Sequence, residues 1–336
     1  MDSLTHIVLG AAIGETVLGK KIGKKAMLWG AFADTIPDFD VFMNPFLQPA
    51  DALISHRGIT HSFLFCFFMA PLFGKLFERI FRRTSAGWKD WSLLFFLGML
   101  THILLDSLTT YGTGLFEPFS HYRVTFNTIF IIDPFYTFPL LISFIALLIL
   151  KKDSAKRKYW NRFGLTLSSL YLLFTVVNKN YINSVFERSL KEQHLSCHDY
   201  FSSPTPLNNI LWSVAAKGDS CYWIGYYSLF DKDKSIAYEC YNKNENLAAA
   251  FKDEKLYKTL QQFSGSFYCI SQDDSLVRFN DLRFGLSGGW NGTKGQFVFS
   301  MGLKRDSKGE LSVTKNAWSL SRFSGISTLI DRIKGK

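Results

Sequence analysis

The stretch FLFCFFMAPLF at residues 63–73 decides the class of fold, because it is an unbroken apolar run without a charged residue. A second stretch, PLLISFIALLIL at residues 139–150, has the same character. Runs this apolar are unusual in the core of a water-soluble protein, whereas a helix that crosses a bilayer needs roughly 20 such residues. The two stretches therefore predict a helical membrane region.

The first half of the chain contains six apolar segments, which short loops connect. They lie at residues 4–18, 26–43, 62–77, 91–110, 129–150 and 163–178. Every second loop is basic, and the loops between them are nearly free of Lys and Arg. The basic residues are Lys20, Lys21, Lys24, Lys25, Lys75, Arg79, Arg82, Arg83, Lys89, Lys151, Lys152, Lys156, Arg157, Lys158 and Arg162. Because basic loops stay in the cytoplasm, the sequence predicts a multi-pass protein of the bacterial inner membrane with both termini outside.

The second half of the chain consists of short alternating runs that turn residues separate. ILWSVAAK at 210–217 and CYWIGYYSLF at 221–230 flank a Gly-Asp-Ser turn, which predicts a β-hairpin. Further strands are expected at residues 235–241, 265–271, 275–279, 295–303 and 310–314, and a helix is expected at 246–263. This pattern is typical of a compact α+β domain of ordinary size.

The predicted fold is thus an all-α polytopic membrane domain of about six helices followed by a β-rich α+β soluble domain. The expected boundaries are residues 1–178 for the membrane domain, 179–206 for a stalk or linker, and 207–336 for the soluble domain. With both termini outside, the soluble domain would be extracytoplasmic.

Charge and cysteine content restrict the partners and the compartment. The net charge of +10 is shared evenly by the two halves and forms no single basic surface, so we expect no nucleic-acid partner. Four of the five cysteines lie in the second half, at Cys197, Cys221, Cys240 and Cys269. In an oxidising compartment they could form two disulfides, and otherwise they would be buried thiols; the sequence leaves both possibilities open.

Four local patterns of His and Asp interrupt the apolar half. They are Asp2-Ser-Leu-Thr-His6, Asp34-Thr-Ile-Pro-Asp38-Phe-Asp40, His56-Arg-Gly-Ile-Thr-His61-Ser and His102-Ile-Leu-Leu-Asp106. A spacing of four residues places two side chains on one face of a helix. Ionisable groups inside a membrane segment are costly, so chains rarely keep them without a partner. The topology that follows from the loop charges places all four patterns on the outer side.

Imidazole and carboxylate groups together suit zinc, and Asp-rich sites also suit manganese or iron. One or two such ions would act as Lewis acids and lower the pKa of bound water. Arg57 and Arg123 are the only cations on the outer side of the first half. Guanidinium groups bind phosphate through two parallel hydrogen bonds. We therefore expect a divalent-metal site, with zinc as the first choice, and both arginines as substrate-binding residues.

The four patterns, with Thr109-Thr110-Tyr111-Gly112 after the last of them, resemble the YdjM-type family of membrane-bound, metal-dependent hydrolases. The resemblance covers the membrane region and does not reach the second half. It implies a set of seven metal ligands: His6, Asp34, Asp38, His56, His61, His102 and Asp106.

The leading hypothesis is an integral membrane hydrolase that attacks a phosphoester or similar bond in a membrane lipid or lipid-linked substrate by metal-activated water. The expected catalytic residues are His61, Asp38 and Asp106, and either of the first two would be the general base. A transporter or channel would use the same groups as an ion or proton path and would spread them through the depth of the bilayer. A scaffold with a structural metal would keep no open coordination position. The sequence leaves the oligomeric state open.

Overall fold

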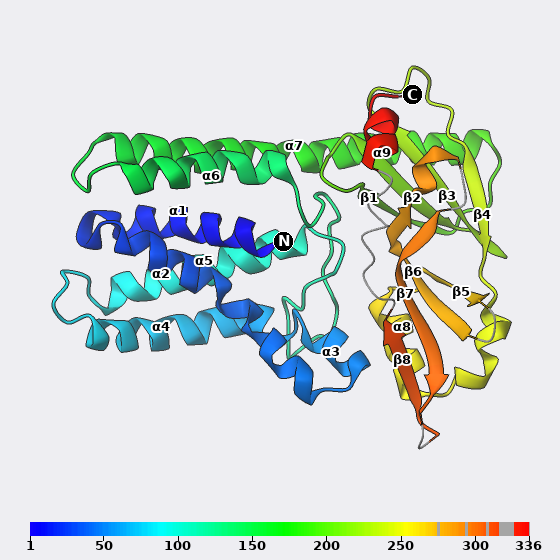
Figure 1. Cartoon of the computed structure of the whole chain (residues 1–336), viewed down its shortest axis with the longest axis horizontal. Helices are drawn as coiled ribbons and strands as arrows, with labels where there is room; N and C mark the ends of the chain where they lie inside the picture. Colours follow the sequence, from blue (N-terminus) through cyan, green and yellow to red (C-terminus); the bar gives the residue numbers. More distant parts are fainter. Residues whose placement is uncertain (274–275, 293–294, 307–308, 316–325, 336) are drawn as a thin grey trace. The chain divides into compact units, whose positions relative to one another are not determined.

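A computed structural model describes residues 1–273, 276–292, 295–306, 309–315 and 326–335 (Figure 1). The chain divides into two compact units. The first comprises Met1–Pro45 and Ser55–Val176, and the second comprises Phe46–Ile54 and Val177–Lys336. The helical N-terminal region and the β-rich C-terminal part that the sequence predicts are both confirmed.

The helices of the first unit correspond to the six apolar segments. They are α1 (Ser3–Ile22), α2 (Lys25–Thr35), α4 (Phe63–Ile80), α5 (Trp88–Ser107), α6 (Pro134–Ile149) and the first part of α7 (Lys156–Glu192). Asp2, Ser62 and Asp133 cap α1, α4 and α6 by accepting a hydrogen bond from a backbone N–H of the first turn. The last helix is longer than its apolar segment, because it continues into the second unit.

The second apolar segment does not form one continuous α-helix. α2 ends at Thr35, and the chain continues as the 3-10 helix η1 (Ile36–Phe46). Pro37 explains the change, because proline has no N–H to donate and its ring disturbs the preceding turn. Two further short elements follow, α3 (Pro49–Ser55) and the 3-10 helix η2 (Ile59–His61).

The helices meet the length and apolar content that a membrane span requires only in part. Among the described residues, none of the helices taken alone has both the length and the apolar content to cross a bilayer. The bent pair Asp51–His61 and Phe63–Ile80, with an angle of 57° between its parts, meets both criteria together, and Pro134–Ile149 is a shorter apolar helix. The six spans expected from the sequence therefore stay a prediction.

The two ends of the first unit differ in composition. Figure 1 shows the α1–α2, α4–α5 and α6–α7 connections at one end of the helices, and these connections carry the basic residues. The N-terminus, η1 and the last turn of α5 lie at the opposite end. The His and Asp patterns and the basic loops are therefore separated by the length of the helices, as the loop charges predict.

The second unit contains two four-stranded antiparallel sheets, each a meander in chain order. The first comprises β1 (Asp199–Pro204), β2 (Leu211–Lys217), β3 (Cys221–Ser228) and β4 (Tyr238–Asn242), and the second comprises β5 (Tyr268–Asp273), β6 (Leu276–Ser287), β7 (Gln296–Arg305) and β8 (Leu311–Lys315). The end of α7 packs on the first sheet through Phe186 and Trp212, and α8 (Lys255–Phe263) packs on the second through Phe263 and Phe299. The remaining elements are η3 (Glu245–Phe251), η4 (Gly289–Asn291) and α9 (Ile326–Ile333).

The predicted hairpin at residues 210–230 is confirmed, with Lys217 opposite Tyr222 across the turn. Two details differ from the expected elements. β1 lies in the stretch assigned to the linker, and the helix expected at 246–263 is divided into η3 and α8. The division occurs because the backbone of Glu254 is extended, with φ −67° and ψ 133°.

The cysteines of the second unit form one disulfide. It joins Cys221 of β3 to Cys240 of β4, with a Cα–Cα distance of 5.8 Å. Cys197 and Cys269 are free thiols, as is Cys66 in the first unit. One pair of these four cysteines therefore forms a disulfide, Cys269 is a buried thiol, and Cys197 is a partly exposed thiol that neither expected possibility describes.

Candidate metal centre

His and Asp side chains from five neighbouring elements of the first unit meet at the end opposite the basic loops. His6 lies in the first turns of α1, and Asp34 lies in the last turn of α2. The 3-10 helices η1 and η2 supply Asp38 and His61. His102 and Asp106 are one helical turn apart on α5, so both side chains leave the same face of that helix.

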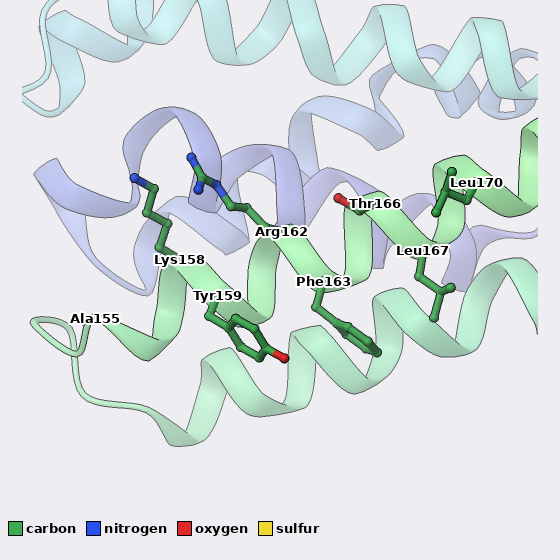
Figure 2. Close-up of a pocket in the computed structure, with 8 residues that line it drawn as sticks. All are labelled: Ala155, Lys158, Tyr159, Arg162, Phe163, Thr166, Leu167 and Leu170. Carbon is green, nitrogen blue, oxygen red and sulfur yellow. The ribbon is translucent and has the colours of Figure 1, made fainter.

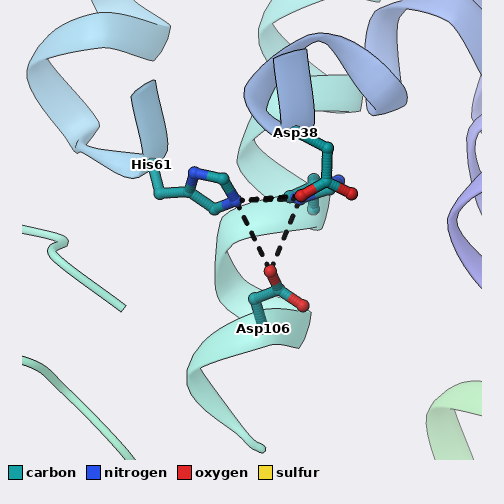
Figure 3. A group of neighbouring side chains, drawn as sticks. Asp38, His61 and Asp106 are labelled. Carbon is teal, nitrogen blue, oxygen red and sulfur yellow. Dashed lines mark hydrogen bonds and ion pairs between the residues drawn. The ribbon is translucent and has the colours of Figure 1, made fainter. Parts of the chain in front are cut away.

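Four donor atoms form the centre of this cluster: Asp38 Oδ1, His61 Nε2, His102 Nε2 and Asp106 Oδ2. The two imidazole nitrogens are 3.2 Å apart, and His61 Nε2 is 3.4 Å from Asp38 and 3.5 Å from Asp106. His102 Nε2 is 3.5 Å from each of the two carboxylates. Figure 3 shows Asp38, His61 and Asp106 converging from three directions.

Five of the six separations among these four atoms are thus 3.2 to 3.5 Å, the edge lengths of a tetrahedron, and the sixth, between the two carboxylate oxygens, is within 4.8 Å. A point equidistant from four corners with such edges is about 2.0 to 2.1 Å from each corner, which is the distance of zinc from nitrogen and oxygen ligands. Two imidazoles and two carboxylates are also donors that zinc accepts. The residues present therefore fit a four-coordinate divalent ion.

Asp34 and Asp40 are not among the four central donors, but each lies next to the Nδ1 atoms of two histidines. Asp34 Oδ2 is 3.0 Å from His6 Nδ1 and 3.4 Å from His102 Nδ1. Asp40 is 2.9 Å from His56 Nδ1 and 3.5 Å from His61 Nδ1. The two shorter contacts are hydrogen bonds, and a carboxylate bonded to Nδ1 fixes the ring and the tautomer of His6 and His56, so that Nε2 keeps the lone pair that a metal needs. His61 Nδ1 is also hydrogen-bonded to Thr60 Oγ1, at 3.1 Å.

Burial separates one of the four donors from the other three. The side chains of His61, His102 and Asp106 are at most 1% exposed, whereas that of Asp38 is 25% exposed. Solvent therefore reaches the cluster at Asp38, on η1. The other three donors are held in the interior of the helical unit.

Asp106 has the largest number of charged neighbours in the cluster. Its Oδ2 atom is 2.9 Å from Arg57 Nε, and its Oδ1 atom contacts the amino group of Met1 and is 3.2 Å from His6 Nε2. A buried carboxylate needs such compensation, because removing a charge from water costs several kcal/mol. Cations around Asp106 thus keep it ionised and able to bind a metal.

The two arginines expected to bind substrate both lie over the ring of Tyr111. The guanidinium carbons of Arg57 and Arg123 are 5.2 Å and 5.5 Å from its ring centroid. Arg57 also donates to Thr109 Oγ1 at 2.8 Å, and Arg123 donates to the carbonyl oxygen of His56 at 2.7 Å. Both groups are engaged with protein acceptors, and their role toward a substrate stays a prediction.

The structure thus sorts the seven expected ligands into three positions. Asp38, His61, His102 and Asp106 form the central tetrahedron, His6 and Asp34 adjoin it on the α1 and α2 side, and His56 adjoins it through Asp40. Two smaller groups of possible ligands, His6–Asp34–His102 and Asp38–Asp40–His56, share members with the central one.

Sequence reasoning missed several residues of this site. Asp40 belongs to the second pattern but not to the expected ligands, although it contacts two histidines of the site and also accepts a hydrogen bond from the backbone N–H of Arg57 at 2.9 Å. Its place two residues after Asp38 was the available signal. Thr101, which donates to Asp34 at 3.2 Å, lies outside the motifs, and Tyr111 lies in the stretch that follows the last motif but had no role assigned to it.

Close helix packing sets the position of Asp34 between α1 and α5. A Cβ atom on Gly10 would lie 2.5 Å from Asp34 Cβ, and one on Gly98 would lie 2.9 Å from Ala33 Cβ. Each glycine lies four residues from a histidine of the cluster, Gly10 after His6 and Gly98 before His102. Both positions therefore need a residue without a side chain to bring the three helices together.

The fold and the cluster together define a class: a helical unit that gathers His and Asp side chains at one end, followed in the chain by a β-rich unit. The sequence profile of the YdjM inner membrane protein family matches residues 1–182, so the chain belongs to this family, and the resemblance seen in its motifs is confirmed. The family places the protein at the bacterial inner membrane.

Two relatives extend this comparison. The chain is 33% identical over 112 residues to inner membrane protein YbcI of Escherichia coli (strain K12), which covers 33% of this chain and 63% of YbcI. It is 24% identical over 237 residues to the uncharacterized protein YfhP of Bacillus subtilis (strain 168), which covers 67% of this chain and 68% of YfhP. No solved structure matches the chain.

Proposed function

We propose that the protein is an integral inner-membrane hydrolase that depends on a divalent metal, with zinc as the first choice. Its substrate class would be a phosphoester or similar bond in a membrane lipid or lipid-linked molecule. The observation that carries the proposal is the central set of four donors, whose separations of 3.2 to 3.5 Å suit a tetrahedral ion. Membership of an inner-membrane family supports a substrate that the bilayer supplies.

The residues of the cluster would have different roles in hydrolysis, which follow from their burial. When bound, the metal would supply Lewis acidity and lower the pKa of water. His61, His102 and Asp106 would hold the ion, since they are buried and oriented by neighbours. Asp38 is the exposed donor, and it can leave its position to admit substrate or accept a proton. This supports Asp38 over His61 as general base, because both ring nitrogens of His61 already face other groups of the site.

The proposed topology places the cluster and the second unit on the outer side of the membrane. The basic loops at the other end of the helices support this orientation. The Cys221–Cys240 disulfide supports it too, because disulfides persist in oxidising compartments outside the bacterial cytoplasm.

The test combines metal analysis with a hydrolysis assay. Full-length protein purified in detergent should contain close to one equivalent of zinc at the central set, and it should release phosphorylated headgroups from phospholipid vesicles. His102→Ala with Asp106→Ala removes two of the four donors, so we expect loss of the metal and at least a 100-fold loss of kcat/KM.

His121→Ala is the matched control, because His121 is 74% exposed and pairs with Glu117 away from the cluster. It should retain both metal and activity. Hydrolysis that survives in the double variant would refute the catalytic proposal, whatever the metal content.

One observation favours a second candidate, a structural metal. Four protein donors already complete a tetrahedron, and structural zinc sites are closed in this way. In that case chelation would lower the Tm strongly and Asp38→Ala would do the same. A catalytic site predicts that Asp38→Ala abolishes hydrolysis while the protein keeps its metal and its fold.

A further inference from the structure

The first part of α7 has one face that packs on the helical unit and one that does not. On the packed face, Asn161 donates to Thr16 Oγ1 at 2.8 Å, and Ser168 donates to the carbonyl oxygen of Tyr136 at 2.8 Å. Gly164 lies so close to α6 that a Cβ atom would be 2.6 Å from Ser143. These contacts fix the rotation of α7 and leave its opposite face exposed.

The exposed face carries two parallel rows of side chains with a spacing of four residues. One row is Lys158, Arg162, Thr166 and Leu170, and the other is Tyr159, Phe163 and Leu167. A hollow of about 540 Å³ runs along these rows (Figure 2). In the figure, Lys158 and Arg162 extend to one side of the helix, and Tyr159 and Phe163 extend to the other.

The chemistry of the hollow changes along its length. Both rows begin with a cationic or amphipathic side chain beside the basic α6–α7 loop, and both end with Leu. Phe163 to Phe174 covers a rise of about 16 Å at 1.5 Å per residue, close to the roughly 15 Å depth of one hydrocarbon leaflet. Leu173 and Phe174 beyond the hollow are exposed as well. The order of charged, aromatic and aliphatic side chains matches the order of headgroup, interfacial region and acyl chain in a bilayer leaflet.

The positive charge at one end of the hollow favours a ligand with an anionic headgroup. Within the part of the chain that the structure describes, Lys158 and Arg162 form no ion pair with an acidic side chain, and no acidic residue lines the hollow. Arg157, by contrast, is buried and paired with Glu15. Two unneutralised cations one helical turn apart can contact the same phosphate.

We propose that this hollow binds one anionic phospholipid of the cytoplasmic leaflet. Lys158 and Arg162 contact its phosphate, Tyr159 lies at the level of the headgroup, and one acyl chain lies along Phe163, Leu167 and Leu170. The site is at the end of the helical unit opposite the His and Asp cluster, so it is independent of the proposed hydrolysis.

Native mass spectrometry of the full-length protein in neutral detergent tests this inference. Dioleoyl-phosphatidylglycerol and dioleoyl-phosphatidylcholine are added separately, and the bound lipid is counted. The wild-type protein should prefer the anionic lipid by roughly tenfold or more, since each basic residue at an interface contributes measurably to the attraction. Lys158→Gln with Arg162→Gln should abolish most of this preference.

Two further arms separate the site from general electrostatic attraction. Lys151→Gln with Lys152→Gln removes the same charge from the adjacent loop, outside the hollow, and should preserve the preference. Phe163→Ser with Leu167→Ser should weaken the binding of both lipids about equally. Glycerophosphoglycerol, which has the headgroup without chains, should not compete at concentrations where the lipid saturates.

Three results would overturn the inference. The first is an equal loss of lipid preference in Lys151→Gln with Lys152→Gln and in Lys158→Gln with Arg162→Gln, which would indicate unspecific electrostatic attraction. The second is full competition by the chain-free headgroup. The third is a dimer that Phe163→Ser with Leu167→Ser dissociates while the binding of both lipids stays as strong as in the wild type, which would assign this face to a second copy of the chain.

Discussion

At the scale of single residues, Asp34 and Asp40 show how two carboxylates can organise four histidines. Neither belongs to the central four donors, but each contacts two Nδ1 atoms. Because such carboxylates fix ring orientation and increase ligand basicity, we expect Asp34→Asn and Asp40→Asn each to weaken zinc binding by about 10- to 100-fold.

Competition with a chelator of known affinity measures this effect on the purified protein. Asp153→Asn, in the α6–α7 loop, provides a control that removes a carboxylate of no relevance to the cluster. Unchanged affinity in both site variants would mean that the histidines are oriented by packing alone.

Lys179 in the second unit offers a pH-dependent prediction away from the cluster. Its ammonium donates to the carbonyl oxygen of Ser202 at 3.0 Å and lies 5.9 Å from the ring centroid of Trp212. Burial lowers the pKa of Lys179 to about 7. Between that pKa and the ordinary value for lysine, the unfolded chain binds the proton and the folded protein does not.

The free energy of unfolding should therefore rise with pH in that window and lose this contribution below pH 7. From pH 7 to pH 9 the rise due to Lys179 is about 2 kcal/mol. Chemical denaturation of wild type and Lys179→Met at each pH isolates it, because the other titrating groups cancel in the difference. A difference between the two proteins that stays constant from pH 7 to pH 9 would contradict this account.

At the scale of helices, the packing of α1, α2 and α5 controls the position of Asp34. Gly10→Ala and Gly98→Ala each add one methyl group where no space exists. We expect either change to separate the helices, to lower stability by about 1 to 3 kcal/mol, and to weaken zinc binding, although neither residue contacts a metal.

Thermal unfolding and zinc affinity are measured together for these variants. Gly87→Ala is the control, because the nearest atom to a Cβ at that position is 3.8 Å away. If stability fell without any change in zinc affinity, helix packing would not be what positions Asp34.

The spacing of apolar residues was sufficient to predict the helices, because an amphipathic or apolar run needs no distant partner to be recognised. The motifs likewise contain all four central donors. The motifs do not show which aspartate is a central donor, because Asp34 and Asp38 have the same chemistry and lie in one motif. Only the turn at Pro37 directs Asp34 toward Nδ1 of His102 and Asp38 toward Nε2. β1 escaped prediction for a similar reason, since Ser202, Ser203 and Pro204 become a strand only by pairing with β2.

At the scale of the whole molecule, the cysteines report the compartment of the second unit. If this unit lies outside the cytoplasm, alkylation of the unfolded, unreduced protein should modify three thiols, those of Cys66, Cys197 and Cys269. Reduction should then release two more, those of Cys221 and Cys240. Intact-mass measurement counts them directly, and Cys221→Ser with Cys240→Ser should give three under both conditions. Five reactive thiols before reduction, in protein isolated under acid quench, would argue for a cytoplasmic location.

The ion pair between Glu15 and Arg157 has a consequence for biogenesis. Glu15 lies within the first apolar helix, and its carboxylate binds the Arg157 guanidinium through Nε at 2.9 Å and through Nη2 at 2.5 Å. A ribosome delivers Arg157 long after α1 has emerged, so an early-inserted α1 would hold an unpaired carboxylate, which costs several kcal/mol in a bilayer. In the multi-pass topology that we propose, the first helix would therefore stay at the translocon or the interface until the last helix of its unit is synthesised, so that the helices insert cooperatively rather than one at a time.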